Sequence, residues 1–426
     1  MNSSHQPVAS LRIVGGRELS GRITVEGNKN AALPLMAACL LTGEECVLEN
    51  VPRIRDVEVL ARLLEGLGAQ VAGLGTPTLR IRCERVATAS PAPDLVGKLR
   101  GSVLLLGPLL ARRGFAHLSQ PGGDFPARRT LTTHLQALVA LGATQRDEPG
   151  TVLEVPNGLA GASMYLDEAS VTGTETALLA AAAAKGRTVI RHAASEPHVV
   201  ELCEFLARMG AHVSGAGTST IVVEGGRLRG ATHRLRGDYI EAGSWSVVAA
   251  ITGGAVEVHG VSAEDMEPIV AVLRAMGLPC RLEENWFATE RAPRLVAVKR
   301  ITTGLWPGFP SDMVSLVTVL ATQAEGRTLV HDWMYELRLF ALEQLSAMRA
   351  DLFLCDPHRM IVTGPTRLRG RALDSRDIRS GMALIAAALA ADGESTLAPL
   401  ETVERGYARL VERLKALGAQ VEEIRA

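Results

Sequence analysis

The stretch Leu67-Gly68-Ala69-Gln70-Val71 recurs in variant form along this 426-residue chain. Successive copies lie roughly 70 residues apart, and self-similarity at a fixed interval is the mark of a repeat architecture. Such repeats predict two globular halves of three units each, because a single core rarely grows to the size of the whole chain. The further copies are Leu141-Gly142-Ala143, Met209-Gly210-Ala211-His212-Val213, Met276-Gly277-Leu278, Met348-Arg349-Ala350 and Leu417-Gly418-Ala419-Gln420-Val421.

Each copy ends the pattern of an amphipathic helix. In the first copy Val57, Leu60, Leu64 and Leu67 fall on one helical face. The glycine that follows predicts a left-handed C-cap, and a strand is expected after it. Arg349 takes the place of this glycine in the fifth copy, so we expect that cap to be weaker or differently built.

A second pattern alternates with the first and consists of an apolar helix, a turn with glycine and a β-branched strand. These helices are apolar on nearly every face, which predicts that they are buried. Each unit then holds one buried helix, one amphipathic helix and several short strands, and the predicted fold class is α/β or α+β. The copies run from Met36 to Val51, Leu104 to Ser119, Leu178 to Ile190, Val247 to Val258, Leu316 to Val330 and Met382 to Leu397.

Composition narrows the classes of function. The formal net charge is −1 and aromatic residues make up 4% of the chain, so neither electrostatic attraction to nucleic acid nor base stacking is expected. The six cysteines show no metal-ligand spacing, and we expect reduced thiols and no metal centre. The polar first ten residues lack a signal-peptide core, and no apolar run is long enough to span a membrane; both features predict a cytoplasmic protein.

Polar and charged residues stand at the predicted starts of all the buried helices. Helix N-termini carry unpaired N–H groups and partial positive charge, so they favour anions. A lysine at such a start either extends to solvent or reinforces an anion site, and repetition of the arrangement favours the second reading. Pseudo-symmetric packing would turn these starts towards one cleft suited to a small anionic ligand. The starts are Gly27 to Asn30, Lys98 to Ser102, Ser170 to Thr176, Glu241 to Ser244, Pro310 to Met313 and Asp377 to Ser380.

The segment from Gln120 to His134 interrupts the repeat. Its glycines and prolines predict a loop, and it presents an aspartate, two arginines and a histidine. Loops of this kind carry function more often than packing. A solvated basic turn is the alternative interpretation.

Several motifs, in the same order along the chain, resemble those of the enolpyruvyl transferases, and among them the members that use UDP-N-acetylglucosamine as acceptor. The resemblance runs nearly end to end. It implies two inside-out α/β domains of three repeats each, joined by a double crossover, with residues 1–28 plus 239–426 in one domain and 29–238 in the other. The motifs are Gly27 to Pro34, Pro121-Gly122-Gly123, Thr172-Gly173-Thr174-Glu175, Phe309 to Met313 and Arg405-Gly406-Tyr407.

The resemblance also implies a reaction. The enolpyruvyl group of phosphoenolpyruvate passes to the 3-hydroxyl of UDP-N-acetylglucosamine and phosphate is released, which is the first committed step of peptidoglycan synthesis. Phosphoenolpyruvate is a co-substrate, and no cofactor is implied. Two alternatives stay open: a sibling transferase acting on another acceptor, such as a nucleoside monophosphate or shikimate 3-phosphate, and a silent paralogue that only binds a sugar nucleotide. A silent binder would need neither a base nor a proton donor, so the retained Lys29, Asp312 and arginines argue against it.

Matched position by position, the site residues of the family fall on the helix starts and on the interrupting loop. Asp312 matches the presumed base, and Lys29 and Arg405 are the other catalytic matches outside the loop. Asp124 stands where many members have a reactive cysteine and is the candidate proton donor. Because fosfomycin alkylates that cysteine, the aspartate implies resistance to it.

The two substrates divide the remaining matches. For phosphoenolpyruvate the implied contacts are Lys29, Asn30, Arg129, Arg338, Arg379 and Arg405. For UDP-N-acetylglucosamine they are Arg100, Arg129, Thr130, Leu131, Thr132, Thr133, Glu168, Ala169, Ser170, Val171, Asp312 and Met334.

Departures from the family pattern lie mainly on the acceptor side. Thr130 follows the loop arginine where proline is usual, and Glu168 stands where a lysine is common. Leu337 replaces a usual asparagine beside Arg338. The phosphoenolpyruvate residues therefore match better than the acceptor residues.

Overall fold

The computed structural model describes residues 9–122, 130–336 and 338–425. The described chain forms two compact units. Residues 26–122 and 130–236 make up the inserted unit, and residues 9–25 and 237–425 make up the terminal unit. The chain therefore passes between the units after Val25 and again after Arg236.

The inserted unit contains α1 (Lys29–Ala38), η1 (Cys39–Leu41), β3 (Cys46–Glu49), α2 (Arg55–Gly66), β4 (Gln70–Ala72), β5 (Thr78–Arg82), α3 (Pro93–Val96), η2 (Arg100–Leu105), α4 (Leu106–Arg113), β6 (Phe115–Leu118), α5 (Thr132–Ala140), β7 (Thr144–Gln145), β8 (Thr151–Glu154), β9 (Ser163–Tyr165), α6 (Val171–Ala183), β10 (Arg187–Arg191), α7 (Pro197–Met209), β11 (His212–Ser214), β12 (Thr220–Glu224) and β13 (Thr232–Arg234), where η marks a 3₁₀ helix.

The terminal unit contains β1 (Ala9–Val14), β2 (Gly21–Thr24), α8 (Tyr239–Ile251), β14 (Val256–His259), α9 (Ala263–Ala275), β15 (Cys280–Glu283), β16 (Trp286–Thr289), β17 (Arg300–Thr302), η3 (Ser311–Met313), α10 (Val314–Ala321), β18 (Gly326–His331), η4 (Arg338–Glu343), α11 (Gln344–Ala347), β19 (Asp351–Asp356), β20 (Arg359–Gly364), β21 (Ala372–Asp374), α12 (Ile378–Ala390), β22 (Glu394–Ala398), α13 (Leu400–Glu404), α14 (Leu410–Ala416) and β23 (Gln420–Arg425).

One sheet pattern repeats through both units. A parallel pair of strands continues into two antiparallel neighbours, as in the orders β13-β3-β5-β4 and β17-β18-β20-β19. The orders β11-β12-β10-β9, β15-β16-β14-β2 and β21-β22-β1-β23 follow the same rule, and β6-β8-β7 is a shortened version. In the terminal unit β1 pairs with both β22 and β23, so the two ends of the described chain share one sheet.

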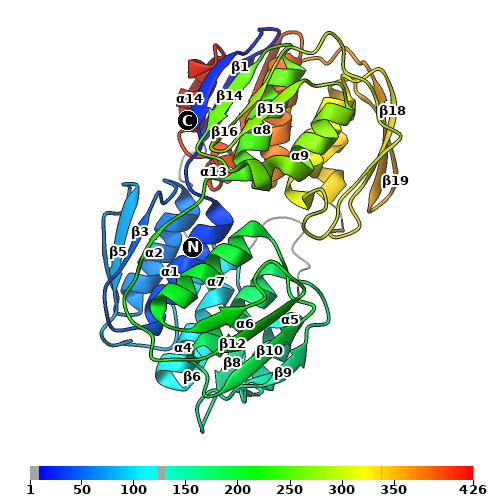
Figure 1. Ribbon diagram of the computed structural model, residues 1–426. Coiled ribbons are helices and arrows are strands. Elements are labelled where there is room, and N and C mark those ends of the chain that lie inside the picture. Colours follow the sequence, from blue (N-terminus) through cyan, green and yellow to red (C-terminus); the bar gives the residue numbers. More distant parts are fainter. Residues whose placement is uncertain (1–8, 123–129, 337, 426) are drawn as a thin grey trace. The chain divides into compact units, whose positions relative to one another are not determined.

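Each unit is built inside out, with helices in the middle and sheets around them (Figure 1). In the terminal unit α8, α10 and α12 pack against one another, and each also packs against strands of its own sheet. Every residue of α8 is buried. A helix that is apolar on all sides can only be stable where it is covered on all sides, so the predicted burial of these helices is confirmed.

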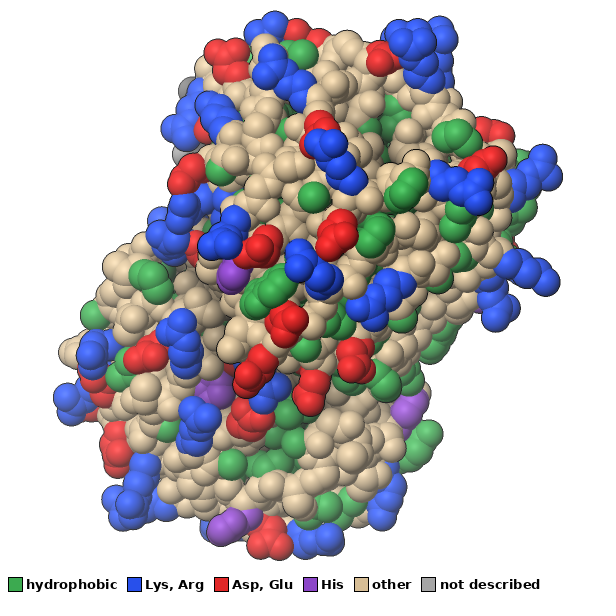
Figure 2. Space-filling model, turned by 45° about the horizontal axis from the view of Figure 1, so that its top comes forward, with side chains coloured by type: hydrophobic (Ala, Val, Ile, Leu, Met, Phe, Trp, Pro, Cys, Tyr) green, Lys and Arg blue, Asp and Glu red, His purple; other side chains and the backbone are tan. Residues whose placement is uncertain are grey.

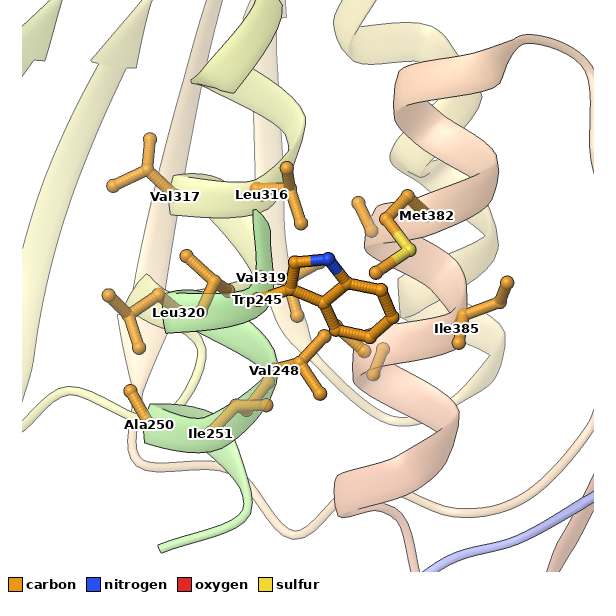
Figure 3. Close-up of a cluster of buried hydrophobic side chains, with 14 of the residues drawn as sticks. Trp245, Val248, Ala250, Ile251, Leu316, Val317, Val319, Leu320, Met382 and Ile385 are labelled. Atoms are coloured by element: carbon orange, nitrogen blue, oxygen red, sulfur yellow. The ribbon is translucent and has the colours of Figure 1, made fainter. Parts of the chain in front are cut away.

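A buried tryptophan lies among side chains of the three central helices of the terminal unit (Figure 3). Trp245 of α8 is fully buried, and Figure 3 shows its ring beside Leu316 and Val319 of α10 and Met382 of α12. These side chains belong to one apolar core. Close packing of this kind makes the relative positions of the three helices hard to change.

The recurring Leu-Gly-Ala motif forms the same helix end six times. In every copy the N–H at the glycine position donates to the carbonyl three residues earlier, and the next N–H donates to the carbonyl five residues earlier, as in a Schellman motif. The predicted left-handed conformation is confirmed at Gly68, Gly142, Gly210, Gly277 and Gly418, whose φ angles lie between 85° and 116°.

Arg349 adopts this conformation without being a glycine. Its φ is 73°, and its two backbone hydrogen bonds, Arg349 N to Ser346 O and Ala350 N to Leu345 O, match those of the other copies. The cap is therefore built like the others, and the prediction of a different construction is wrong. The Cβ of a left-handed residue crowds the carbonyl that follows, which costs roughly 1–2 kcal/mol.

Arg349→Gly is expected to stabilise the protein by about 1 kcal/mol, because glycine adopts this conformation freely and the exposed arginine loses little packing. Denaturant unfolding of both proteins measures the difference. The reciprocal variant Gly418→Arg, at a cap with room for a side chain, should destabilise by a similar amount. An unchanged midpoint for both variants would refute the argument.

Charged side chains of both signs lie on the surface, and the described helices can be compared with what a membrane span requires. Figure 2 shows Lys and Arg side chains scattered among Asp and Glu side chains over the face drawn, in keeping with the net charge of −1. Within the described residues no helix combines the length and apolar character that a membrane crossing requires.

Candidate active site

The starts of the three central helices of the terminal unit carry the polar side chains. The carboxylates of Asp238 and Asp377 cap α8 and α12 by accepting backbone N–H groups of the first turn. The third helix, α10, is entered through η3, which contains Asp312. Glu241, expected at the opening of the fourth buried helix, lies inside the first turn of α8, because Asp238 rather than Glu241 is the cap.

Asp312 lies between two buried arginines. Its Oδ1 accepts from Nη1 of Arg338 at 3.1 Å, and its Oδ2 accepts from Nε and Nη2 of Arg379 at 3.3 and 3.1 Å. The Asp312 side chain keeps 27% of its surface exposed, whereas both arginine side chains are almost covered. A partly accessible carboxylate flanked by two guanidinium groups can interact with both a hydroxyl and an anion.

A chain of hydroxyl groups extends this site to the start of α8. Arg379 Nη1 donates to the hydroxyl oxygen of Tyr407 at 3.2 Å, and that hydroxyl lies 2.7 Å from Ser244 Oγ. Ser244 donates to the carbonyl of Ile240 at 2.7 Å, which leaves Tyr407 as the donor to Ser244. Tyr407 and Arg379 also make a cation–π contact with 5.6 Å between guanidinium and ring. From the sequence, Ser244 is recognisable only as part of a predicted helix start. No pattern in the neighbouring residues indicates that it contacts Tyr407.

The electrostatics keep both arginines charged. Burial lowers the pKa of Arg379, but the carboxylate of Asp312 and other negative groups raise it by more, so the net pKa is above its ordinary value. For Arg338 the same balance holds: burial lowers the pKa, and Asp312 and Asp332 raise it further. Burial also raises the pKa of Tyr407, which agrees with a neutral phenol that donates a hydrogen bond.

In the inserted unit, Lys29 is the first residue of α1. Its Nζ lies 2.8 Å from Oδ2 of Asp56, a buried residue in the first turn of α2. Asn28 caps α1 through the N–H groups of Asn30 and Ala31. Lys29 therefore does not extend freely to solvent, and its role at an anion site stays a prediction. The sequence does not indicate that Asp56 pairs with Lys29, because an acidic residue in the first turn of a helix is common.

The predicted acceptor residues of the inserted unit meet around the starts of α5 and α6. Arg100, the first residue of η2, donates from Nη2 to the carbonyl of Thr130 at 2.9 Å. Thr133 on α5 donates to Asp167 Oδ1 at 2.6 Å and lies 3.3 Å from Glu168 Oε1. Thr132 begins α5, Leu131 precedes it, and Ser170, which follows Ala169, caps α6 directly before Val171.

Two further predicted site residues, Arg405 and Met334, lie in loops of the terminal unit. Arg405 directly follows α13 and is half-buried, and Met334 lies after β18 with its N–H donating to Asp332 Oδ1 at 3.2 Å. Asp124, Arg129 and Leu337 lie outside the described residues. The structure thus gathers Asp312, Arg338 and Arg379 in the terminal unit, and Arg100, Thr130, Thr133 and Glu168 in the inserted unit.

His134 faces the interior of the inserted unit, where its Nε2 lies 2.9 Å from the Thr172 hydroxyl. Burial and the charge of Arg100 lower its pKa from 6.5 to about 4. The unfolded chain therefore binds more protons between these values, so stability is full above about pH 6.5 and falls as the pH drops towards 4. His134→Gln should flatten this part of the pH profile in denaturant unfolding. Equal losses in both proteins would show that other groups are responsible.

Known proteins match this chain over nearly its whole length. A family model described as EPSP synthase (3-phosphoshikimate 1-carboxyvinyltransferase) matches residues 13–414. A Treponema denticola protein named UDP-N-acetylglucosamine 1-carboxyvinyltransferase is 42% identical over 418 residues, which are 96% of this chain and 98% of that protein. A protein of the same name from Bradyrhizobium diazoefficiens is 43% identical over 420 residues, 97% of each.

Solved structures share the fold. The enolpyruvyl transferase NikO from Streptomyces tendae superimposes with a TM-score of 0.89 at 25% identity, over 99% of this chain and 100% of that one. An EPSP synthase from Acinetobacter baumannii reaches 0.77 at 19% identity, over 98% and 100%. The predicted fold class, with inside-out α/β units of repeated elements, is confirmed. The family match covers almost the whole chain, and the protein therefore belongs to the EPSP synthase family of enolpyruvyl transferases.

Proposed function

We propose that this enzyme transfers the enolpyruvyl group of phosphoenolpyruvate to the 3-hydroxyl of UDP-N-acetylglucosamine and releases phosphate. The observation that carries the proposal is identity of 42 and 43% to two proteins named for this activity, over nearly the full length of all three chains. The position of Asp312 between two arginines supports it, because the reaction needs a base beside an anion site.

The proposed chemistry has two steps. In the first, Asp312 accepts the proton of the 3-hydroxyl, the hydroxyl oxygen bonds to C2 of phosphoenolpyruvate, and the electron pair of the C2–C3 double bond takes a proton at C3 from Asp124. In the second, the carboxylate that Asp124 has become takes a proton from C3, the C–H electron pair forms the C2–C3 double bond again, and the C2–O bond to phosphate breaks. The leaving phosphate takes the proton held by Asp312, so both aspartates return to their starting states and no redox partner is required. A role for Asp124 as donor requires a raised pKa, which desolvation can provide.

The binding roles follow the chemistry of the side chains. Lys29, Asn30, Arg129, Arg338, Arg379 and Arg405 are proposed to hold phosphoenolpyruvate, because bidentate arginines suit both carboxylate and phosphate. UDP-N-acetylglucosamine is assigned to Arg100, Arg129, the threonines and leucine at 130–133, the segment 168–171, Asp312 and Met334. The proposed enzyme needs no cofactor beyond its co-substrate and works in the cytoplasm.

Phosphate release separates the proposed acceptor from its alternatives. Purified protein is supplied with phosphoenolpyruvate and one acceptor at a time: UDP-N-acetylglucosamine, shikimate 3-phosphate or a nucleoside monophosphate. The proposal expects acceptor-dependent phosphate only with the sugar nucleotide. Turnover with another acceptor alone would identify a sibling transferase, and binding of the sugar nucleotide without turnover would identify the silent paralogue.

Fosfomycin should leave this enzyme active, because a carboxylate is a far weaker nucleophile towards an epoxide than a cysteine thiolate. Intact-mass spectrometry after incubation should show no adduct on the natural protein. Asp124→Cys should acquire one covalent adduct and lose activity with time. Stoichiometric labelling of the natural protein would contradict the expectation.

A further inference from the structure

A second carboxylate lies in the interior of the terminal unit, next to the Asp312 site. Asp332 follows β18 and is fully buried. Its backbone is fixed to the turn between β19 and β20, because Asp332 N donates to His358 O at 2.9 Å and the Asp332 carbonyl lies 2.8 Å from His358 Nδ1. Neither the sequence patterns nor the proposed chemistry use this residue.

Both oxygens of this carboxylate accept hydrogen bonds from segments far apart in the chain. Oδ1 accepts from the Thr303 hydroxyl at 2.9 Å and from Met334 N at 3.2 Å. Oδ2 accepts from the Ser311 hydroxyl at 2.7 Å. Asp332 therefore joins the end of β17, the start of η3 and the loop after β18. A fully buried carboxylate is stable only when its oxygens are satisfied in this way.

The bond from Ser311 determines what that hydroxyl can do on its other side. A hydroxyl has one proton, and Ser311 gives that proton to Asp332. Its oxygen is then an acceptor for Arg338, whose Nη1 lies 2.8 Å away, and the same nitrogen donates to Asp312 Oδ1 at 3.1 Å. Arg338 also stacks over Tyr335 with 4.5 Å between guanidinium and ring.

We infer that Asp332 is a positioning residue: through Ser311 it fixes the guanidinium of Arg338 against Asp312. The inference rests on the proposed function for the role of Arg338 as a ligand of phosphoenolpyruvate. Without the carboxylate, the Ser311 hydroxyl is free to turn its proton towards the guanidinium, where donor would face donor. Arg338 would then lose one of the contacts that hold it in place.

Asp332→Asn tests this arrangement with almost no change in shape. An amide has one oxygen and one NH₂ group, so one orientation places NH₂ against Ser311 and the other places NH₂ against Met334 N–H. A backbone N–H cannot accept a hydrogen bond, so the second orientation leaves two donors facing each other. In the first orientation Ser311 loses its carboxylate acceptor. The substitution therefore disturbs the Ser311–Arg338 contact without opening a cavity.

Kinetics with phosphoenolpyruvate provide the main measurement. Asp332→Asn is expected to lower kcat/KM for phosphoenolpyruvate by about tenfold, the size expected for a lost hydrogen bond to a charged group. Ser311→Ala should lower it to a similar extent. In an Arg338→Ala background, Asp332→Asn should cause no further loss, because residues that act through a common partner are not additive. Losses that multiply, or an Asp332→Asn variant with natural kinetics, would overturn the inference.

Two controls separate this inference from fold stability and from the proposed function. Asp392→Asn removes a surface carboxylate of the same unit, ion-paired with Arg367 and Arg369, and should leave kcat/KM unchanged. A crystal structure of Asp332→Asn should show the Arg338 guanidinium moved away from Ser311, and an unmoved side chain would refute the inference even if the protein has no transferase activity. If the natural protein releases no phosphate with any acceptor, the proposed function fails, and this structure still decides the role of Asp332.

Discussion

Asp312→Asn is expected to lower kcat by about a thousandfold. Asparagine keeps the shape of the side chain, but its single oxygen can accept from only one of Arg338 and Arg379, which donate to different oxygens of Asp312. It cannot take the proton of the acceptor hydroxyl, and a general base contributes about 10² to 10⁴ in rate. Initial rates at saturating concentrations of both substrates measure the effect.

The Asp312→Asn variant must be shown to be folded before its rate is interpreted. Loss of the carboxylate leaves two buried guanidinium groups with less compensation, so a lower melting temperature is expected for Asp312→Asn. The rate must therefore be measured where circular dichroism shows the variant to be folded. A folded variant with kcat within tenfold of the natural enzyme would exclude Asp312 as the base.

Trp245→Ala is expected to destabilise the protein by about 3–5 kcal/mol, the usual cost of truncating a buried tryptophan. Its ring lies among side chains of α10 and α12, and its indole N–H donates to Glu241 Oε1 at 3.2 Å. The variant opens a cavity at the point where the three central helices meet. Denaturant or thermal unfolding measures the loss.

Trp245→Phe is the matched control. It keeps most of the apolar volume and removes the bond to Glu241, which retains its contact with Arg413. A loss close to that of alanine would mean that the hydrogen bond, rather than the packing, is the main contribution. A loss below about 1 kcal/mol for alanine would show that the core closes around the missing ring.

Local sequence was sufficient for much of the fold. The repeated Leu-Gly-Ala motif ends a helix in all its copies, because the cap depends on the backbone of a few neighbouring residues. The all-apolar helices are buried for an equally local reason, since no face of α8 can be left in water. Arg349 shows where this local rule fails. The motif predicts a glycine at this position, yet an arginine adopts the same left-handed conformation.

Sequence patterns also pointed to several candidate residues in each unit. Lys29, Asp312 and Arg379 stand at helix starts, where unpaired N–H groups and charge favour anions, and the family resemblance pointed to the same residues. Their partners could not be found in this way. Asp56, which pairs with Lys29, and Asp332, which holds Ser311, look like ordinary acidic residues of a helix and a loop.

Which side chains meet was settled by packing alone. Asp312 and Arg379 are 67 residues apart, and Ser244 and Tyr407 are 163 apart, yet each pair is hydrogen-bonded. Periodicity and caps report on forces that act within a few residues along the chain. Contacts between distant segments depend on how α8, α10 and α12 pack around Trp245, which no short stretch of sequence encodes. Repeats and helix starts are thus encoded locally, whereas the core of the terminal unit decides that Asp312 and Arg379 meet.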